Sequence, residues 1–229
     1  MTVWNEASSV LPPGQVVVGG FPRFGTSISG PPPAVPRDPV IQVRGAVAEE
    51  LDVRLDVLDA LPRRDLRADF HCVSGWSATG LSWAGVPFAS FYRAYVEPAL
   101  APDVVVTHLV FRGYDGFRSV LTIEDALADD VLVADHLDGE PLGGDHGAPA
   151  RLVSPRQYGY VSTKHLCRID VHTAEPTHVQ RSWALRILAP HPRARVAEEE
   201  RHRYVPAWAL RGPYRFLMRR LLSQSRAAS

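Results

Sequence analysis

The chain has 229 residues, of which 45% are hydrophobic and 22% are charged. These fractions are typical of a globular protein with a substantial core, and they exclude a disordered or coiled-coil chain. The 25 basic side chains balance 25 acidic ones, so the net charge gives no indication of nucleic-acid binding. Every basic side chain except Lys164 is an arginine, so this lysine is an exception to a compositional bias.

The first residues carry no recognisable targeting signal. Residues 1–10 lack a basic cluster and an apolar run, and no stretch approaches the roughly 20 apolar residues that span a bilayer. The two cysteines, Cys72 and Cys167, are too few for a disulfide scaffold. We therefore expect a cytoplasmic protein with free thiols. A single bridge between the two cysteines stays open, because the sequence does not give their separation.

Proline and glycine dominate residues 11–39, so this stretch forms neither a regular helix nor a central strand. We expect an N-terminal arm over residues 1–39 that is either disordered or extended across a domain. Alternating apolar residues then predict a strand at 40–47, while 54–61 read as a short helix and 67–73 as a further extended segment. The folded domain therefore begins where the first of these strands begins.

Further elements follow along the chain. Pro87 can start a helix, and the apolar residues after it share one face at helical spacing: Phe88, Phe91, Tyr92, Tyr95 and Val96. The apolar, β-branched run at 104–111 predicts a buried strand. Thr122 caps a short predicted helix through Ala128, with acidic residues suitably placed in its first turn. Three more short strands are predicted, at residues 131–134, 151–153 and 165–171.

Many short strands with few short helices predict an α+β or β-rich domain, which we place at residues 40–190. A C-terminal extension, residues 191–229, ends in a basic amphipathic helix. Its apolar residues follow the spacing i, i+3, i+4, i+7, i+8: Tyr214, Leu217, Met218, Leu221 and Leu222. Such a helix either docks its apolar face on its own domain or binds an anionic membrane or a partner protein.

His71 and Cys72 lie between an extended segment and the turn-like pair at 74–75. A lone cysteine is usually a small buried hydrophobe. Zinc is disfavoured, because the sequence has no CxxC or HExxH motif and adjacent strand residues point to opposite faces. A cysteine nucleophile with His146 or His165 as its base stays open, since the sequence does not fix that geometry.

A second cluster gathers basic and hydroxyl side chains within residues 146–164: His146, Arg151, Ser162, Thr163 and Lys164. Arginine offers a planar fork for phosphate oxygens, lysine a compact point charge, and hydroxyl groups short hydrogen bonds. Glycines and prolines between them favour a fixed backbone shape. The cluster therefore predicts a phosphate site, against the alternative of an ordinary solvated loop.

Four segments together resemble the sulfite-oxidase family: 69–77 (DFHCVSGWS), 83–87 (WAGVP), 138–152 (DGEPLGGDHGAPARL) and 158–166 (YGYVSTKHL). They are similar to the molybdopterin-binding catalytic domain of its small bacterial members, including the methionine sulfoxide reductase subunit. The likeness extends over roughly residues 40–172, with the motifs in the family's order. It implies a sulfite-oxidase-type α+β fold, with mixed β-sheets, a barrel-like core and short peripheral helices.

The resemblance implies that Cys72 is the catalytic residue, as the thiolate ligand of molybdenum. A soft thiolate suits a soft, redox-active metal, and coordination deprotonates the thiol. His71 would then either contact the cofactor or serve the structure of the loop. Molybdenum and molybdopterin are the implied cofactors.

The remaining implied site residues belong to the cluster at 146–164. His146 and Arg151 would contact the pterin or its phosphate. Ser162, Thr163 and Lys164 would hold the terminal phosphate, partly through backbone N–H groups. Because the cofactor is anionic, cationic side chains and N–H donors are what its pocket requires.

The implied activity is two-electron oxygen-atom transfer by a molybdopterin-dependent oxidoreductase acting on a small sulfur- or nitrogen-oxide substrate. The residues after Cys72, 73–76 (VSGW), differ from the arginine-bearing stretch of true sulfite oxidases and favour the sulfoxide-reductase-like branch. Arg23 and Arg112 either line the substrate mouth or form surface ion pairs.

The sequence contains no haem domain, so we expect a separate redox partner that carries haem, flavin or an iron–sulfur cluster. The C-terminal helix is a candidate for docking that partner or for a peripheral membrane contact, with no transmembrane segment. Two alternative functions stay open: a non-catalytic molybdopterin-binding protein, and a cysteine-nucleophile hydrolase.

Overall fold

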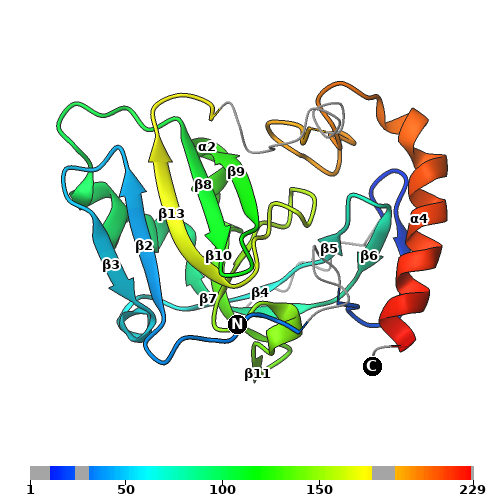
Figure 1. The fold of residues 1–229 in the computed structure, drawn as a ribbon, viewed down its shortest axis with the longest axis horizontal. Coiled ribbons are helices and arrows are strands. Elements are labelled where there is room, and N and C mark those ends of the chain that lie inside the picture. The colour runs from blue at the N-terminus through cyan, green and yellow to red at the C-terminus, as the bar shows by residue number, and fades with distance from the viewer. Residues whose placement is uncertain (1–10, 24–30, 177–188, 228–229) are drawn as a thin grey trace, which may run out of the picture.

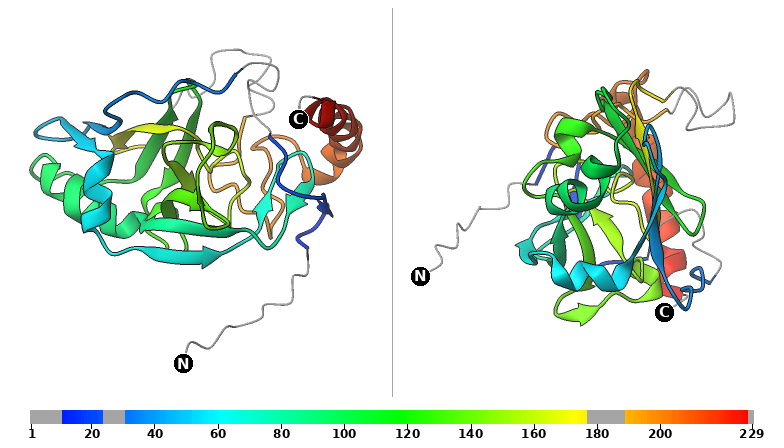
Figure 2. Two further views of the ribbon diagram at one scale, coloured as in Figure 1. Left: turned by 90° about the horizontal axis from the view of Figure 1, so that it is seen from below. Right: turned by 90° about the vertical axis from the view of Figure 1, so that its left-hand side faces the viewer.

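The computed structural model of the chain describes residues 11–23, 31–176 and 189–227. Two five-stranded β-sheets form the body of the molecule, and a small three-stranded sheet lies beside the long C-terminal helix at the other end (Figure 1). The view from below places this helix at the edge of the molecule, next to the small sheet (Figure 2). Within the described ranges, no helix is long and apolar enough to span a membrane.

The first sheet has the strand order β3-β2-β13-β8-β9. Its central strand, β13, runs parallel to β2 and antiparallel to β8. Gly45 has φ of +97°, and a Cβ there would lie 2.3 Å from the carbonyl oxygen of Val171, so only glycine allows this close approach of β2 to β13. The strands predicted at 40–47 and 165–171 are confirmed. The bounds are β2 Val40–Gly45, β3 Leu51–Arg54, β8 His108–Gly113, β9 Arg118–Thr122 and β13 Leu166–His172.

The second sheet has the order β11-β10-β7-β4, and β12 also pairs with β10. All of these pairings are antiparallel, and a register shift between Ala134 and His136 bends β10. The strands predicted at 131–134 and 151–153 are confirmed. The bounds are β4 Arg64–Arg67, β7 Ser82–Pro87, β10 Leu132–Leu137, β11 Glu140–Pro141 and β12 Arg151–Val153.

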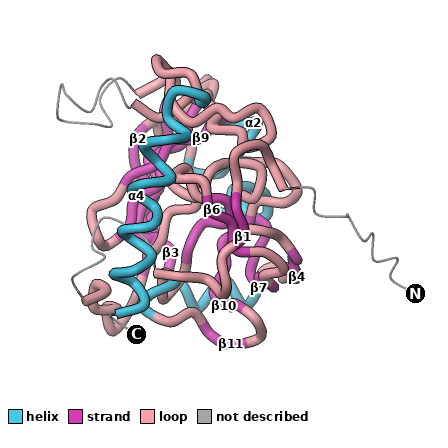
Figure 3. Tube along the Cα trace, turned by 90° about the vertical axis from the view of Figure 1, so that its right-hand side faces the viewer, coloured by secondary structure: helices cyan, strands magenta, loops and turns pink. Residues whose placement is uncertain are grey.

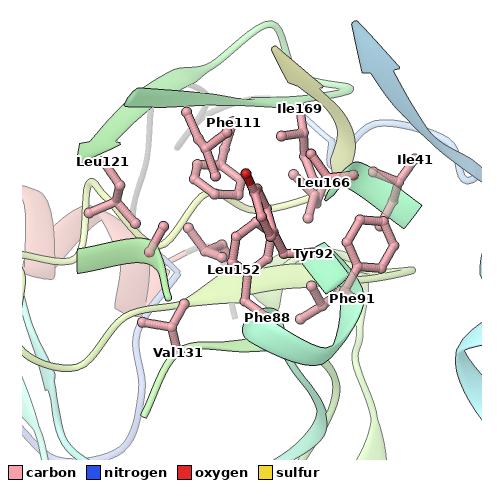
Figure 4. Packing of buried hydrophobic residues seen from close by; sticks show 14 of the residues in the cluster. Ile41, Phe88, Phe91, Tyr92, Phe111, Leu121, Val131, Leu152, Leu166 and Ile169 are labelled. Carbon is pink, nitrogen blue, oxygen red and sulfur yellow. The ribbon is translucent and has the colours of Figure 1, made fainter. Parts of the chain in front are cut away.

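The main core lies between these two sheets, with aromatic side chains at its centre (Figure 4). The helix predicted after Pro87 begins as α1, Phe88–Phe91, and continues through a π-helical turn, Tyr92–Val96, and a 3₁₀ turn, Glu97–Ala99. Phe88 and Phe91 are fully buried, which confirms the predicted apolar face. Each sheet contributes alternate apolar side chains to the same space.

Two short helices at the edge of the core also match the sequence. The helix predicted at 54–61 is a 3₁₀ helix, Leu55–Ala60, whose Leu58 is buried. Helix α2 spans Ile123–Ala126, and the Thr122 hydroxyl accepts a hydrogen bond from the Asp125 N–H at 3.2 Å. The predicted cap is therefore confirmed.

The buried strand predicted at 104–111 is only partly correct. β8 starts at His108, and Val105 is 75% exposed. Asp103 has φ of +59° in a turn closed by a hydrogen bond from the Val104 N–H to the Ala101 carbonyl oxygen, so the chain reaches the neighbour strand β13 only at Thr107. The extended segment predicted at 67–73 likewise divides between the end of β4 and a separate strand, β5.

The small sheet has the order β1-β6-β5, with β1 Val16–Val17, β5 Phe70–His71 and β6 Trp76–Ala78. β1 belongs to the N-terminal arm and pairs in parallel with β6, so residues 11–23 lie extended across the domain. The stretch after residue 189 returns to the body of the molecule, where Ala194 is part of the main core. Residues on both sides of the boundary predicted at 190 therefore share one core.

The C-terminal helix, α4, spans Ala207–Ala227 and runs alongside β1 and β6 (Figure 3). It is longer than the apolar pattern from Tyr214 indicated, and Pro213 lies inside it. Met218 packs against the hydrophobic cluster that contains Cys72, and the Tyr214 hydroxyl contacts His202 Nε2. The predicted positions 217, 221 and 222 lie outside the described side chains. At Tyr214 and Met218, α4 therefore packs against the rest of this chain.

Candidate functional site

Cys72 lies in the tight turn between β5 and β6. The Cys72 N–H donates to the Trp76 carbonyl oxygen at 2.8 Å, and the Gly75 N–H donates to the Cys72 carbonyl oxygen at 2.9 Å. Gly75 has φ of +96°, a conformation that favours glycine. We call this turn, residues 72–75, the thiol side of the site.

The thiol itself is almost fully enclosed. Cys72 is 6% exposed, and its Sγ lies 3.1 Å from the Ser74 hydroxyl. Burial raises the pKa of the Cys72 thiol, although the Ser74 hydrogen bond and the Arg201 charge act in the opposite direction. The group is therefore a neutral thiol until a metal or a cation displaces its proton.

The N-terminal arm supports the thiol side through a buried polar chain. Gln15 Nε2 donates to the Cys72 carbonyl oxygen at 3.2 Å, and Gln15 Oε1 accepts from the Ser77 hydroxyl at 3.1 Å. Ser77 Oγ also lies 2.8 Å from His71 Nδ1. Burial lowers the pKa of His71, so its ring is neutral at pH 7. This series of hydrogen bonds holds the Cys72 turn in position.

Arg151 is the central residue of the opposite side. It is fully buried on β12, and its guanidinium donates to the carbonyl oxygens of His146 at 2.9 Å and Ser162 at 3.0 Å. Desolvation lowers the pKa of Arg151 to about 9. No carboxylate in the described ranges forms an ion pair with it, so its charge has no counter-ion within that part of the chain.

Aromatic rings surround the Arg151 guanidinium. Its central carbon lies 5.0 Å from the Trp83 ring centroid, 5.7 Å from Phe70 and 5.9 Å from Phe21. Phe21, from the N-terminal arm, stacks on the His146 ring with centroids 4.7 Å apart. Such rings hold a buried cation by cation–π attraction without neutralising it.

His146 and Trp83 each have a buried polar atom near the Arg151 guanidinium. His146 Nδ1 and Trp83 Nε1 have no hydrogen-bond partner among the described residues. Burial, followed by the charges of Lys164 and Arg151, lowers the pKa of His146 to about 4, so the ring is neutral. Unpaired buried polar atoms are rare in folded proteins and indicate a missing partner such as a ligand or water.

Lys164 lies against the same loop. Its Nζ donates to the Asp145 carbonyl oxygen at 2.6 Å. Burial, followed by the charges of Arg151 and Arg23, lowers the pKa of Lys164 to about 7. Gly147 has φ of +111°, and a Cβ there would lie 3.1 Å from the Lys164 Cα, so the loop packs closely on this residue. We call Arg151, His146 and Lys164 the cation side of the site.

The two predicted hydroxyl groups already have partners within the protein. Ser162 Oγ accepts from the Ser154 N–H at 3.1 Å. Thr163 Oγ1 lies 2.7 Å from the Ser119 hydroxyl on β9. Ser162 contacts Arg151 through its backbone carbonyl oxygen, which accepts a hydrogen bond from the guanidinium.

A small cavity lies next to both sides: Arg151 of the cation side lines it, and Cys72 does not. His71, which precedes Cys72, lines the cavity together with Arg151 and Ser162. The His71 carbonyl oxygen also accepts from the Gly159 N–H at 2.7 Å, which ties β5 to the loop that leads into Ser162. Segments nearly 80 residues apart in sequence are therefore neighbours, as the predicted site requires. The other lining residues are Asp69, Phe70, Trp83, Val153, Ser154, Pro155 and Gln157.

The structure also settles the alternatives left open for the two cysteines and describes the contacts of Arg112 and Arg23. Both cysteines are free thiols, so they form no disulfide bridge. Arg112 pairs with the buried Asp170 inside the first sheet, as the ion-pair alternative predicted. Arg23 lies 3.2 Å from Asp145, beside the cation side.

Sequence reasoning missed three residues at this site: Gln15, Phe21 and Arg201. Arg201 is 1% exposed and donates to the carbonyl oxygen of Val73, next to Cys72. Nothing in the sequence distinguishes it from the many other arginines. Gln15 and Phe21 lie in the proline-rich arm, whose composition gives no indication that it crosses the site.

Comparisons with known proteins agree with this geometry. Residues 29–180 match the family model of the oxidoreductase molybdopterin binding domain. The uncharacterized oxidoreductase YuiH of Bacillus subtilis is 31% identical over 166 residues, which cover 71% of this chain and 79% of that protein. The protein-methionine-sulfoxide reductase catalytic subunit MsrP of Xanthomonas campestris is 29% identical over 164 residues, which cover 65% of this chain and 51% of that protein. The chain thus spans about half the length of this reductase.

A solved structure shares the fold. The sulfane dehydrogenase SoxCD of Paracoccus pantotrophus aligns with a TM-score of 0.51 and 22% identity, over 59% of this chain and 38% of that chain. The α+β fold of the sulfite-oxidase type is confirmed. Because the family model covers more than half of the chain, the chain belongs to the family of oxidoreductase molybdopterin-binding domains.

Proposed function

We propose that the chain is a molybdenum-cofactor-dependent oxidoreductase that transfers an oxygen atom to or from a small sulfur- or nitrogen-oxide substrate. The observation that carries the proposal is Arg151, a fully buried cation with no carboxylate partner in the described ranges. A buried charge without a counter-charge is costly, and a bound anion offsets that cost. The phosphate of molybdopterin is an anion that the Arg151 fork can hold through paired hydrogen bonds.

The residues around Arg151 fit the rest of the cofactor. A pterin is flat and carries both hydrogen-bond donors and acceptors. His146 Nδ1 and Trp83 Nε1 are buried and lack a partner in the described part of the chain, so they can bind such a ring. Phe21 and Phe70 supply flat apolar surfaces beside them. These donors and rings around Arg151 would suit a pterin with a phosphate.

Cys72 would be the molybdenum ligand. Its thiol is buried and neutral, and coordination by a metal removes the proton from such a thiol. When bound, the cofactor supplies the two-electron redox chemistry of oxygen-atom transfer. The protein holds the cofactor, keeps water from the buried thiol and orients the site. Lys164, also on the cation side, would add positive charge for the phosphate when it is protonated.

A metal analysis with a turnover assay tests the proposal. The purified chain, expressed in a host that makes the cofactor, should contain stoichiometric molybdenum and release a fluorescent pterin on oxidation. It should also reduce a sulfoxide with a dye as the electron donor. Full cofactor content without any oxygen-atom transfer would support a non-catalytic binding protein instead. Absence of molybdenum and pterin would contradict both.

The hydrolase alternative lacks support at the thiol. Cys72 Sγ contacts the Ser74 hydroxyl, and no histidine hydrogen-bonds to it within the described ranges. Burial raises its pKa, whereas a nucleophilic cysteine requires a lowered one. His165, one of the two candidate bases, has its Nδ1 2.7 Å from the Ala148 carbonyl oxygen.

We propose a sulfur oxide as the substrate. The turn after Cys72 contains no arginine that would bind a sulfite-like oxyanion. The relative MsrP is, by its name, a reductase of protein methionine sulfoxide. Turnover with methionine sulfoxide should therefore exceed turnover with sulfite, and the reverse order would contradict this choice of substrate.

We propose that a separate redox partner docks on the outward face of α4. Trp208 and Phe216 are each 74% exposed there, and Arg215 is exposed between them. α4 carries arginines and no acidic residue, so it suits a partner with an acidic surface. Replacing both aromatic residues by serine should slow electron transfer from the partner severalfold and leave molybdenum content unchanged. Loss of binding to anionic vesicles instead would identify a peripheral membrane contact.

We also propose a cytoplasmic location. Both cysteines are free thiols, which supports a reducing compartment. Cell fractionation of the native host tests this: recovery of the chain with cytoplasmic markers is expected, and recovery with periplasmic markers would contradict it.

A further inference from the structure

Arg201, in the C-terminal extension, contacts the Cys72 turn and does not line the cavity. It is 1% exposed, and its guanidinium donates to the Val73 carbonyl oxygen and, at 3.4 Å, to the Gly14 carbonyl oxygen. Its central carbon lies 5.3 Å from the Tyr158 ring. One buried side chain therefore connects the C-terminal extension, the thiol side and the N-terminal arm.

Glycines make room for this contact. A Cβ on Gly14, where φ is +71°, would lie 2.8 Å from Arg201 Nη2. A Cβ on Gly75 would lie 3.0 Å from the Gly14 carbonyl oxygen and 3.8 Å from Arg201 Nη1. A side chain on Gly14 would therefore displace the guanidinium, and one on Gly75 would press on the Gly14 carbonyl oxygen, so the arm, the turn and Arg201 are closely packed.

Arg201 also forms an ion pair within the C-terminal extension. Glu199 Oε1 lies 3.7 Å from Arg201 Nη2, and Glu199 also pairs with Arg211 on α4. The guanidinium therefore joins this pair to the Val73 and Gly14 carbonyl oxygens that it holds.

We propose that Arg201 is a positioning residue for the Cys72 sulfur: it clamps the turn that carries the sulfur. The proposal rests on the proposed function, since the thiolate is the metal ligand there. Arg201 lies beyond residues 29–180, which match the family model, so the C-terminal extension of this chain completes the thiol side.

The first test uses cofactor-free protein and therefore does not depend on the metal. Cys72 is 6% exposed, so a maleimide reaches it only when the turn opens. In a Cys167→Ser background, Arg201→Lys keeps the charge but loses the fork, and Gly14→Ala displaces the guanidinium without changing it. In both variants, Cys72 should react with the maleimide about tenfold faster than in the parent. This is the factor expected when one charge-assisted hydrogen bond is lost from the closed state.

Matched controls separate this effect from general destabilisation. Arg203→Lys changes an exposed arginine two positions away that pairs with Glu175. Gly116→Ala introduces a side chain at a similar φ of +78° with no atom within 4 Å. Both controls should label at the parent rate. Equal rates in Arg201→Lys, Gly14→Ala and the parent would overturn the proposal.

The second test uses the loaded protein. Because the sulfur position sets the electronic structure of the metal, the Mo(V) paramagnetic resonance spectrum should shift in Arg201→Lys and stay unchanged in Arg203→Lys. An unchanged spectrum in Arg201→Lys would overturn the role of the clamp in positioning the thiolate. A parent protein without molybdenum would instead contradict the proposed function, while the labelling result would still decide whether Arg201 holds the turn.

Discussion

The two sides of the site are assembled in different ways. On the cation side, Arg151 and Lys164 donate to backbone carbonyl oxygens of one stretch of sequence, residues 145–162, and Phe21 from the arm stacks on His146. The thiol side is a four-residue turn that two distant segments support, through Gln15 from the arm and Arg201 from the C-terminal extension. The polar contacts of the cation side are thus local in sequence, whereas those that hold the thiol side come from segments far apart in sequence.

The largest effect is expected from Cys72→Ser. Serine is a poor ligand for a soft metal, so turnover should fall by at least about 10³-fold, the scale of losing a group at the reacting centre. Because the cation side is intact, the variant should still bind the pterin. Steady-state kinetics and pterin release measure the two effects. Loss of the pterin together with the metal would break the distinction between the two sides.

Arg151→Met should act on the cation side. Losing the paired hydrogen bonds to a phosphate should weaken cofactor binding about 100-fold. Without cofactor, the free energy of unfolding of the variant should differ from that of the parent by less than about 2 kcal/mol, because removal of an uncompensated buried charge offsets the lost hydrogen bonds. Equilibrium unfolding and cofactor titration test both statements. Arg156→Met, at an exposed ion pair, is the control and should change neither.

Lys164→Arg should have a smaller effect, although it keeps the charge. The Lys164 ammonium donates to the Asp145 carbonyl oxygen at 2.6 Å as a compact point charge. A bulkier planar guanidinium would not reproduce this contact, so cofactor retention should fall about tenfold. Normal cofactor content would mean that the lone lysine has no special role in the site.

The pH dependence of cofactor binding gives the smallest effect. The pKa of Lys164 is lowered to about 7, so the ammonium that attracts the phosphate is lost as the pH rises through that value. A bound phosphate raises the pKa again, and the dissociation constant should therefore increase about fivefold between pH 7 and pH 8. Lys164→Arg, whose guanidinium stays charged, should flatten this dependence. A parent profile that is flat between pH 7 and 9 would contradict the role of Lys164.

Features that depend on neighbouring residues could be predicted from the sequence, whereas features that depend on distant contacts could not. The resemblance identified Cys72 and Arg151 because both lie in short contiguous motifs, and local patterns identified most strands and the helix after Pro87. Arg201 could not be found, since its role depends on a contact with Val73, 128 residues away. The start of β8 at His108 was missed for a related reason: a turn around Asp103, rather than apolar composition, decides where pairing with β13 begins.

Whether the Cys72 sulfur binds molybdenum can be measured by X-ray absorption at the molybdenum edge, on the purified parent protein and on Cys72→Ser. We expect a molybdenum–sulfur shell in the parent that has one sulfur fewer in the variant, with the two sulfurs of the pterin still present. An identical sulfur shell in both proteins would contradict this expectation.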